Sequence, residues 1–166
     1  EHHRTPDVVI HDHGDKLILP GFIDTHIHFP QTQVIASYGA QLLDWLEKYT
    51  FPAEARYASP EHAARQATFF IDELLRNGTT TAVAYGSVHR ISAEALFAES
   101  EKRGTMMLAG KTCMDRNAPA VLCDSPESAY DDTAALIAAW HRRGRQQVVI
   151  TPRFAITSTP AQMEMS

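Results

Sequence analysis

The sequence predicts an α/β fold in which parallel strands alternate with helices. From residue 21 onward, short apolar runs rich in β-forming residues are each followed by a polar loop and an amphipathic stretch that ends near a glycine. Strands separated by helices of this length form right-handed βαβ units, which build a parallel sheet. The expected strands are residues 22–29, 79–85, 105–111 and 147–154.

Capping residues mark where three helices begin. Ser59 and Ser125 each precede a proline and a glutamate, so each is expected to cap a helix whose first position is the proline. The first of these helices should end at Asn77-Gly78. Thr159 is followed by a proline and, three positions on, by a glutamine, a pattern that predicts another helix with a capping box.

Two further helices are expected between these elements. An irregular insertion over residues 31–58 contains a short helix around residues 42–49, which should end before Phe51-Pro52. Another helix spans about residues 92–103 and is closed by a glycine.

Residues 1–20 precede the alternating pattern and are treated separately. Val8–Ile10 and Leu17–Leu19 are short apolar runs on either side of a polar segment that contains a glycine. This arrangement predicts a β-hairpin that ends at Pro20. Because an isolated hairpin is marginally stable, it needs further strands to pack against.

The strand expected at residues 22–29 carries a pair of metal-ligating side chains. Side chains alternate across a strand, so Asp24, His26 and His28 share one face. Neutral imidazoles at positions i and i+2 can reach one zinc or iron ion, and Asp24 is placed to orient or neutralise them. The alternative is a solvated face of a half-buried strand. It is disfavoured because the other face is apolar, and ionisable groups do not line a buried face without partners.

The remaining histidines are assigned no metal. His11 and His13 lie in a polar turn and are expected to be solvated. His2 and His3, whether native or added, are uninformative. The others are expected at the surface, or next to the site residues without binding metal or substrate themselves: His62, His89 and His141.

Two architectures fit the strand and helix pattern, a (β/α)₈ barrel and a doubly wound open sheet. The open sheet would be favoured by a glycine-rich phosphate loop after the first strand, but His28 is followed by Phe-Pro-Gln. The barrel is therefore favoured, with only its first half present. A barrel places active-site groups at the carboxyl ends of its strands. The polar residues at or near those ends are His26, His28, His89, Lys111 and Arg153.

Composition narrows the class of protein. The net charge of −5 gives no basis for a nucleic-acid partner. Cys113 and Cys123 are too few for a disulfide scaffold and are expected to be free thiols. No apolar run reaches ~18 residues and no leader pattern is visible, so neither a membrane partner nor secretion is expected. The predicted location is the cytoplasm.

Several stretches together resemble the motifs of a known enzyme family. The motif at residues 20–28, Pro-Gly-Phe-Ile-Asp-Thr-His-Ile-His, resembles the first-strand metal motif of the amidohydrolase superfamily. Further matching stretches are residues 29–31, 42–54, 77–81, 114–119 and 151–154. Taken together, they span about residues 16 to 166 and resemble the guanine deaminases of that superfamily. The resemblance implies a TIM-type barrel of the metal-dependent hydrolase kind, with residues 21–166 as its truncated first half and residues 1–20 as part of a small β-sandwich.

The resemblance also implies a reaction and its residues. The reaction is hydrolytic deamination of guanine to xanthine and ammonia in purine catabolism, with one zinc ion or, alternatively, iron. His26 and His28 would be metal ligands, with His28 also bordering the substrate, while Gln31, Arg153 and Phe154 would contact the purine. The remaining ligands and the glutamate that acts as general acid and base are expected beyond residue 166. The full-length protein is expected to be a homodimer.

Other interpretations stay open from the sequence. The chain could belong to a related amidohydrolase that deaminates or dechlorinates another amino-heterocycle, or to a catalytically dead barrel used for protein assembly. Judged without the resemblance, Arg153 fits an ion pair at the barrel rim, Gln31 a solvated loop and Phe154 the core.

Overall fold

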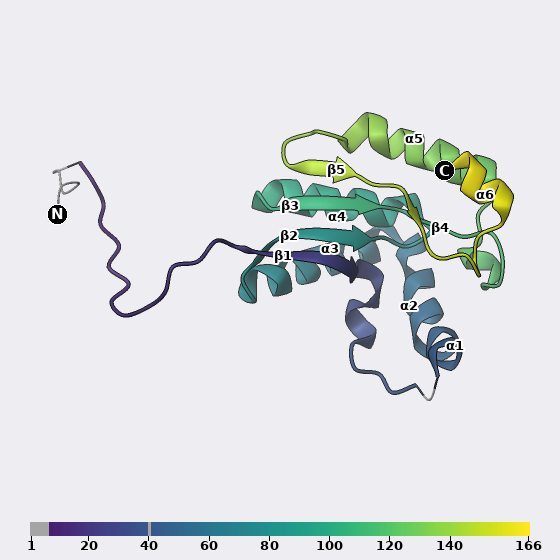
Figure 1. Cartoon of the computed structure of the whole chain (residues 1–166), viewed down its shortest axis with the longest axis horizontal. Helices are drawn as coiled ribbons and strands as arrows, with labels where there is room; N and C mark the ends of the chain where they lie inside the picture. Colours follow the sequence, from purple (N-terminus) through teal and green to yellow (C-terminus); the bar gives the residue numbers. More distant parts are fainter. Residues whose placement is uncertain (1–6, 40) are drawn as a thin grey trace.

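The computed structural model describes residues 7–39 and 41–166 and contains a parallel sheet backed by helices (Figure 1). Four strands are hydrogen-bonded in chain order: β1 (Phe22–His28), β2 (Thr79–Tyr85), β3 (Met106–Gly110) and β5 (Gln146–Val148). Every pairing is parallel. Beyond these strands, two short parallel strands continue the third and fourth: β4 (Thr112–Cys113) and β6 (Thr151–Pro152). The expected strand at residues 147–154 is therefore interrupted.

Long helices connect the strands and lie side by side. The helix α3 (Pro60–Arg76) packs against α4 (Arg90–Arg103), and α4 packs against α5 (Pro126–Trp140), on the same side of the sheet (Figure 1). The helical segments are η1 (Phe29–Val34), α1 (Leu42–Trp45), η2 (Leu46–Thr50), α2 (Phe51–Ala55), η3 (Arg56–Ala58), α3 (Pro60–Arg76), α4 (Arg90–Arg103), η4 (Ala120–Leu122), α5 (Pro126–Trp140) and α6 (Pro160–Met165). A doubly wound sheet would reverse its strand order and carry helices on both faces. The sequential order confirms the predicted partial barrel, whose described edges are β1 and β5.

The core lies between the sheet and its helices. Ala82 and Ala84 of β2 and Met107 and Ala109 of β3 are fully buried against the helices. The alternating residues, such as Val83, face the other way and are half-buried. Strand alternation therefore separates a packed outer face from a concave inner face that would line a barrel.

Each predicted cap residue accepts a backbone N–H of its helix, but the capping box predicted at Thr159 does not form, because the Gln162 side chain donates to Asp124 and the Thr159 N–H donates to Asp115. Ser59 Oγ accepts the backbone N–H of His62 at 3.2 Å, and Ser125 forms a reciprocal capping box with Ser128. Gly104 closes α4 in the left-handed conformation, with φ of 70°. The serine caps accept N–H groups that have no partner at the start of a helix, and the N–H of Gly104 donates to a carbonyl of the last turn of α4.

The helical insertion is longer than predicted. Instead of ending before Phe51-Pro52, the helical path continues through η2, whose turns are wide π turns, into α2. Pro52 has no backbone N–H to donate to the carbonyl four residues before it. In a wide π turn each carbonyl accepts from the residue five positions later, so this missing donor is tolerated. This extension brings Glu54 into the interior.

The predicted hairpin in residues 1–20 is wrong for the part that the structure describes. Val8–Ile10 and Leu17–Leu19 are exposed and form no strand, and only a turn at Gly14 joins them. Two short runs do not bury enough surface to order a hairpin without further strands. Residues 1–6, including His2 and His3, lie outside the described residues.

Candidate metal and substrate site

Two imidazoles meet at the carboxyl end of β1. The ring centroids of His26 and His28 are 5.2 Å apart, in an edge-on arrangement. Tyr85 lies opposite His28 on the neighbouring strand β2, and the two rings stack with their centroids 4.7 Å apart. The centroids of the Tyr85 and His26 rings are 5.4 Å apart. The two histidines therefore lie on the same side of the strand, as the alternation predicts. The contribution of Tyr85 was not predicted, because only the strand register places it there.

Asp24 does not take the role predicted for it. Its Oδ1 accepts the backbone N–H of His26 at 3.0 Å instead of an imidazole N–H. The register of β1 against β2 also shifts between Asp24 and Ile27. Such an irregularity breaks simple alternation, so the three polar residues do not share one face in the expected way.

The surroundings of His28 favour a neutral ring. The pKa of His28 is lowered to about 4, chiefly by burial and also by the positive charges of Arg153 and His26. Its Nδ1 is buried and has no hydrogen-bond partner among the described residues. A neutral imidazole with an unpaired nitrogen is the form that binds a metal ion.

The pair fits part of a metal site. Among residues 7–39 and 41–166, no group of three or more histidine, cysteine or acidic side chains is arranged to hold a metal. A catalytic zinc takes three protein ligands as a rule. His26 and His28 can therefore supply two ligands of a site that other residues must complete.

Gln31 and Arg153 converge on one buried carboxylate. Gln31 Nε2 donates to Oε1 of Glu54 at 3.2 Å, and Arg153 Nη1 donates to Oε2 of Glu54 at 2.6 Å. The Glu54 and Arg153 side chains are only 1% and 5% exposed. Arg153 is thus in an ion pair, but a buried one, and Gln31 is not a solvated loop residue.

Glu54 was missed because the insertion helix was expected to stop before it. The available signal was a single carboxylate in the apolar run Phe51-Pro52-Ala53-Glu54-Ala55. An acidic residue in such a run has to find a cationic or hydrogen-bonding partner when it is buried. Which partner it finds, 99 positions along the chain, is visible only in the fold.

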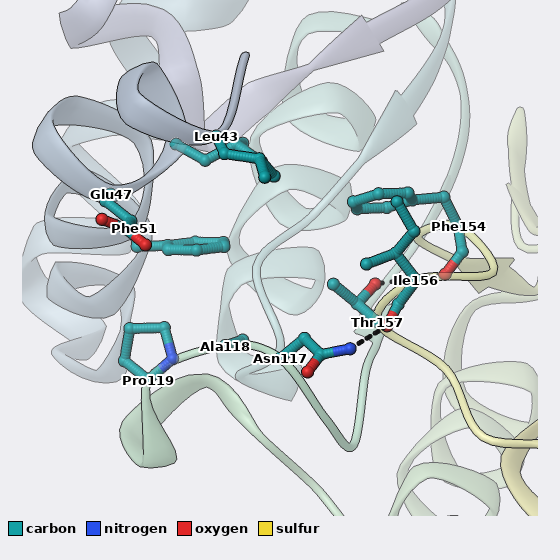
Figure 2. A pocket seen from close by; sticks show the side chains of 10 residues that line it. Leu43, Glu47, Phe51, Asn117, Ala118, Pro119, Phe154, Ile156 and Thr157 are labelled. Atoms are coloured by element: carbon teal, nitrogen blue, oxygen red, sulfur yellow. Dashed lines mark hydrogen bonds between the residues drawn. The ribbon is translucent and has the colours of Figure 1, made fainter. Parts of the chain in front are cut away.

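Phe154 lines a cavity of about 610 Å³ at the same end of the sheet. Figure 2 shows the rings of Phe51 and Phe154 pointing toward each other from opposite walls. The Arg153 guanidinium lies 5.6 Å from the centroid of the Phe51 ring, which connects this cavity to the buried ion pair. The remaining lining is mostly apolar and comes from α1, η2 and two loops: Leu43, Leu46, Glu47, Asn117, Ala118, Pro119, Ile156 and Thr157.

Another polar residue at a strand end, Lys111, is engaged elsewhere. Lys111 is buried and paired with Asp124, which also accepts the side-chain amide of Gln162 at 2.7 Å. His62 is buried edge-on against Tyr57, so it is not a surface residue.

Comparison with known proteins identifies the family. Residues 17–166 match the sequence profile of the amidohydrolase family. The chain belongs to this family. The guanine deaminase of Escherichia coli K12 is 52% identical to this family member over 165 residues, covering 99% of this chain and 38% of the relative.

Two solved structures show the same fold. Guanine deaminase from Bradyrhizobium japonicum has a TM-score of 0.86 and 45% identity, over 88% of this chain and 32% of that one. Guanine deaminase from C. acetobutylicum, solved with guanine in its active site, has a TM-score of 0.83 and 31% identity, over 88% of this chain and 35% of that one. This amidohydrolase chain therefore spans about a third of the length of the relatives it matches. Among its described helices, none has the length and apolar character to cross a membrane.

Proposed function

We propose that the full-length protein hydrolytically deaminates guanine to xanthine and ammonia, in purine catabolism. The observation that carries this proposal is the meeting, at one end of the sheet, of an imidazole pair with an arginine and an amide held by one carboxylate. The similarity to guanine deaminases over nearly the whole chain supports the choice of substrate.

One zinc ion is the proposed cofactor, and His26 and His28 would hold it. The unpaired, buried Nδ1 of His28 and its lowered pKa fit this role. When bound, zinc acidifies water and supplies hydroxide at neutral pH. The further ligands and the glutamate that moves the proton are proposed to lie outside residues 1–166.

The protein residues bind and orient the base. Arg153 offers N–H donors in a planar fork to a purine carbonyl, and Gln31 offers a side-chain amide. Phe154 offers a ring face on which a base can pack. His28 borders the substrate as well as the metal. His28 and Gln31 line a cavity beside β1, and Phe154 lines the cavity at the carboxyl end of the sheet.

The wider organisation is proposed from the family resemblance. Residues 1–20 are assigned to a small β-sandwich, and residues 21–166 to the first half of the barrel. The exposed apolar residues of Val8–Ile10 and Leu17–Leu19 support the first assignment, because they have no packing partner in the described part of the chain. A cytoplasmic homodimer completes the proposal.

The test is turnover of guanine by the purified full-length protein. Xanthine and ammonia should form in equal amounts, with about one zinc per chain measured by elemental analysis. Adenosine, cytosine and triazines are the comparison substrates. Preferential turnover of one of these would instead assign the protein to a related amidohydrolase. No turnover together with no bound zinc would identify a barrel without catalytic function.

A further inference from the structure

We propose that Glu54 is a positioning residue that fixes which hydrogen-bonding groups Gln31 and Arg153 present to the substrate. The inference rests on the proposed function and goes beyond it by naming a determinant of specificity. Glu54 itself would not touch the base. It would act through the two side chains that its carboxylate holds.

The geometry gives each partner its own oxygen. Oε1 of Glu54 accepts from Gln31 and Oε2 accepts from Arg153, so both oxygens are occupied by donors that come from different parts of the chain. Glu54 is fully buried, which excludes water as a competing donor. A charge-assisted hydrogen bond to a buried carboxylate is stronger and more directional than a neutral one.

The backbone of Glu54 is held in place too. Ser87 Oγ donates to the Glu54 carbonyl at 3.0 Å, and the backbone N–H of Ser87 donates to Ser92 Oγ at 2.8 Å. Ser87 and Ser92 are fully buried. The carboxylate therefore sits on a rigid support between α2 and the start of α4, as a group that orients other side chains must.

This arrangement fixes the polarity of the substrate-facing groups. Because the Gln31 NH₂ group points to Glu54, its carbonyl oxygen is left to accept a hydrogen bond. Arg153 uses Nη1 on Glu54 and keeps further N–H donors for the substrate. One acceptor beside several donors matches a base edge that carries an N–H next to a carbonyl, as the lactam edge of guanine does. It mismatches an edge with a ring nitrogen next to an amino group.

The deciding variant is Glu54→Gln in the full-length, zinc-loaded protein, assayed on guanine and on 2,6-diaminopurine. The two substrates carry the same 2-amino group but have opposite polarity on the neighbouring edge. A neutral amide at position 54 allows the side-chain amide of Gln31 to flip, so that its oxygen and NH₂ group exchange places. It also removes the negative charge that pairs with Arg153. We expect kcat/KM on guanine to fall on the order of 100-fold, the cost of misplacing a bound substrate. The guanine preference over 2,6-diaminopurine should fall at least about tenfold, because buried polar mismatches set such ratios.

Two controls separate positioning from folding. Glu101→Gln removes the carboxylate of a surface pair with Arg143 and should leave both activities within about twofold of wild type. Zinc content and melting temperature are measured for every variant. If Glu54→Gln does not fold, Glu54→Asp takes its place. This variant keeps the negative charge but has a shorter side chain, and its preference for guanine over 2,6-diaminopurine is measured in the same way.

The outcomes distinguish this inference from the proposed function. Equal loss on both substrates, or unchanged kinetics, would overturn the positioning role while guanine deamination by the wild type stands. If the wild type does not deaminate guanine, the proposed function fails. Crystal structures of wild type and Glu54→Gln then decide the role of Glu54. Displaced Gln31 and Arg153 side chains support it, and unmoved ones refute it.

Discussion

At the scale of single residues, the buried Glu54–Arg153 pair dominates the energetics of the site. Both charges have lost nearly all contact with water, and their attraction and hydrogen bonds offset that loss. Removing one partner is costly because the other charge stays buried without compensation. A surface pair such as Glu101–Arg143 contributes only up to about 1 kcal/mol, because water screens it.

Arg153→Ala should therefore reduce both stability and guanine turnover. The expected loss in the free energy of unfolding is about 3–5 kcal/mol, the range for breaking a buried ion pair. Zinc content should be retained, since Arg153 is not among the proposed ligands. Urea denaturation, elemental analysis and steady-state kinetics measure the three effects. Unchanged kinetics on guanine would return Arg153 to a purely structural role.

The lowered pKa of His28 predicts a pH-dependent stability of the metal-free protein. In the unfolded chain this histidine takes up a proton near its usual pKa of 6.5, but in the fold it resists protonation until about pH 4. The unfolded state therefore binds more protons within this window, and stability is lost as pH falls through it. Above about pH 6.5 the stabilisation is fully present.

Urea denaturation of wild type and His28→Asn at pH 7, 5.5 and 4.5 measures this effect. The variant should show a shallower loss on acidification. Part of the loss should remain, because burial also lowers the pKa of His62 and His89. Identical pH profiles for the two proteins would contradict the assignment to His28.

At the scale of elements, the close approach of neighbouring segments decides where Arg153 lies. Gly110 ends β3 beside the short segment that joins β5 to β6, and a Cβ there would stand 2.1 Å from the backbone oxygen of Val149. Backbone atoms cannot give way as a flexible side chain can. Only glycine lets the strand that leads to Arg153 approach this closely.

Gly110→Ala should destabilise the protein by about 3 kcal/mol or more, as expected when extra volume enters a tight core. Gly144→Ala is the matched control. Nothing lies near its Cβ position, but its φ is 55°, so its cost should stay at about 1–2 kcal/mol. Thermal unfolding compares the two variants. A larger loss for Gly144→Ala would show that the contact at Val149 is easily relieved.

At the scale of the whole molecule, β1 and β5 are the open edges of the sheet within residues 7–39 and 41–166. A cavity of about 530 Å³ beside β1 is lined by apolar side chains such as Ile27, Phe69 and Leu74, along with His28 and Gln31. Another cavity lies between α5 and α6 and includes Ile137 and Ile150. Unpaired strand edges and exposed apolar faces of this kind promote association.

Residues 1–166 produced alone should be inactive on guanine and should aggregate or dimerise. A (β/α)₈ barrel takes roughly 250 residues, and two histidines without further ligands should hold zinc weakly. Light scattering, equilibrium dialysis with zinc and the guanine assay test these points. A monomeric, zinc-loaded and active fragment would falsify both the half-barrel description and the proposed mechanism.

The sequence by itself determined the elements and the local chemistry. Capping serines, terminal glycines and alternating apolar residues predicted the long helices, the parallel strands and the histidine pair, because these features depend on neighbours within a few positions. The wide turn that carries the insertion helix through Pro52 was missed, since it is permitted only by packing around it.

Only the tertiary structure decided how distant residues meet. Glu54 and Arg153 are 99 positions apart, and no local pattern records that one will neutralise the other. The stacking of Tyr85 on His28 depends on strand register, and the backbone role of Asp24 depends on an irregularity in that register. Local sequence sets which backbone conformations are low in free energy. Burial and charge compensation across the fold select the partners that a buried polar group must have.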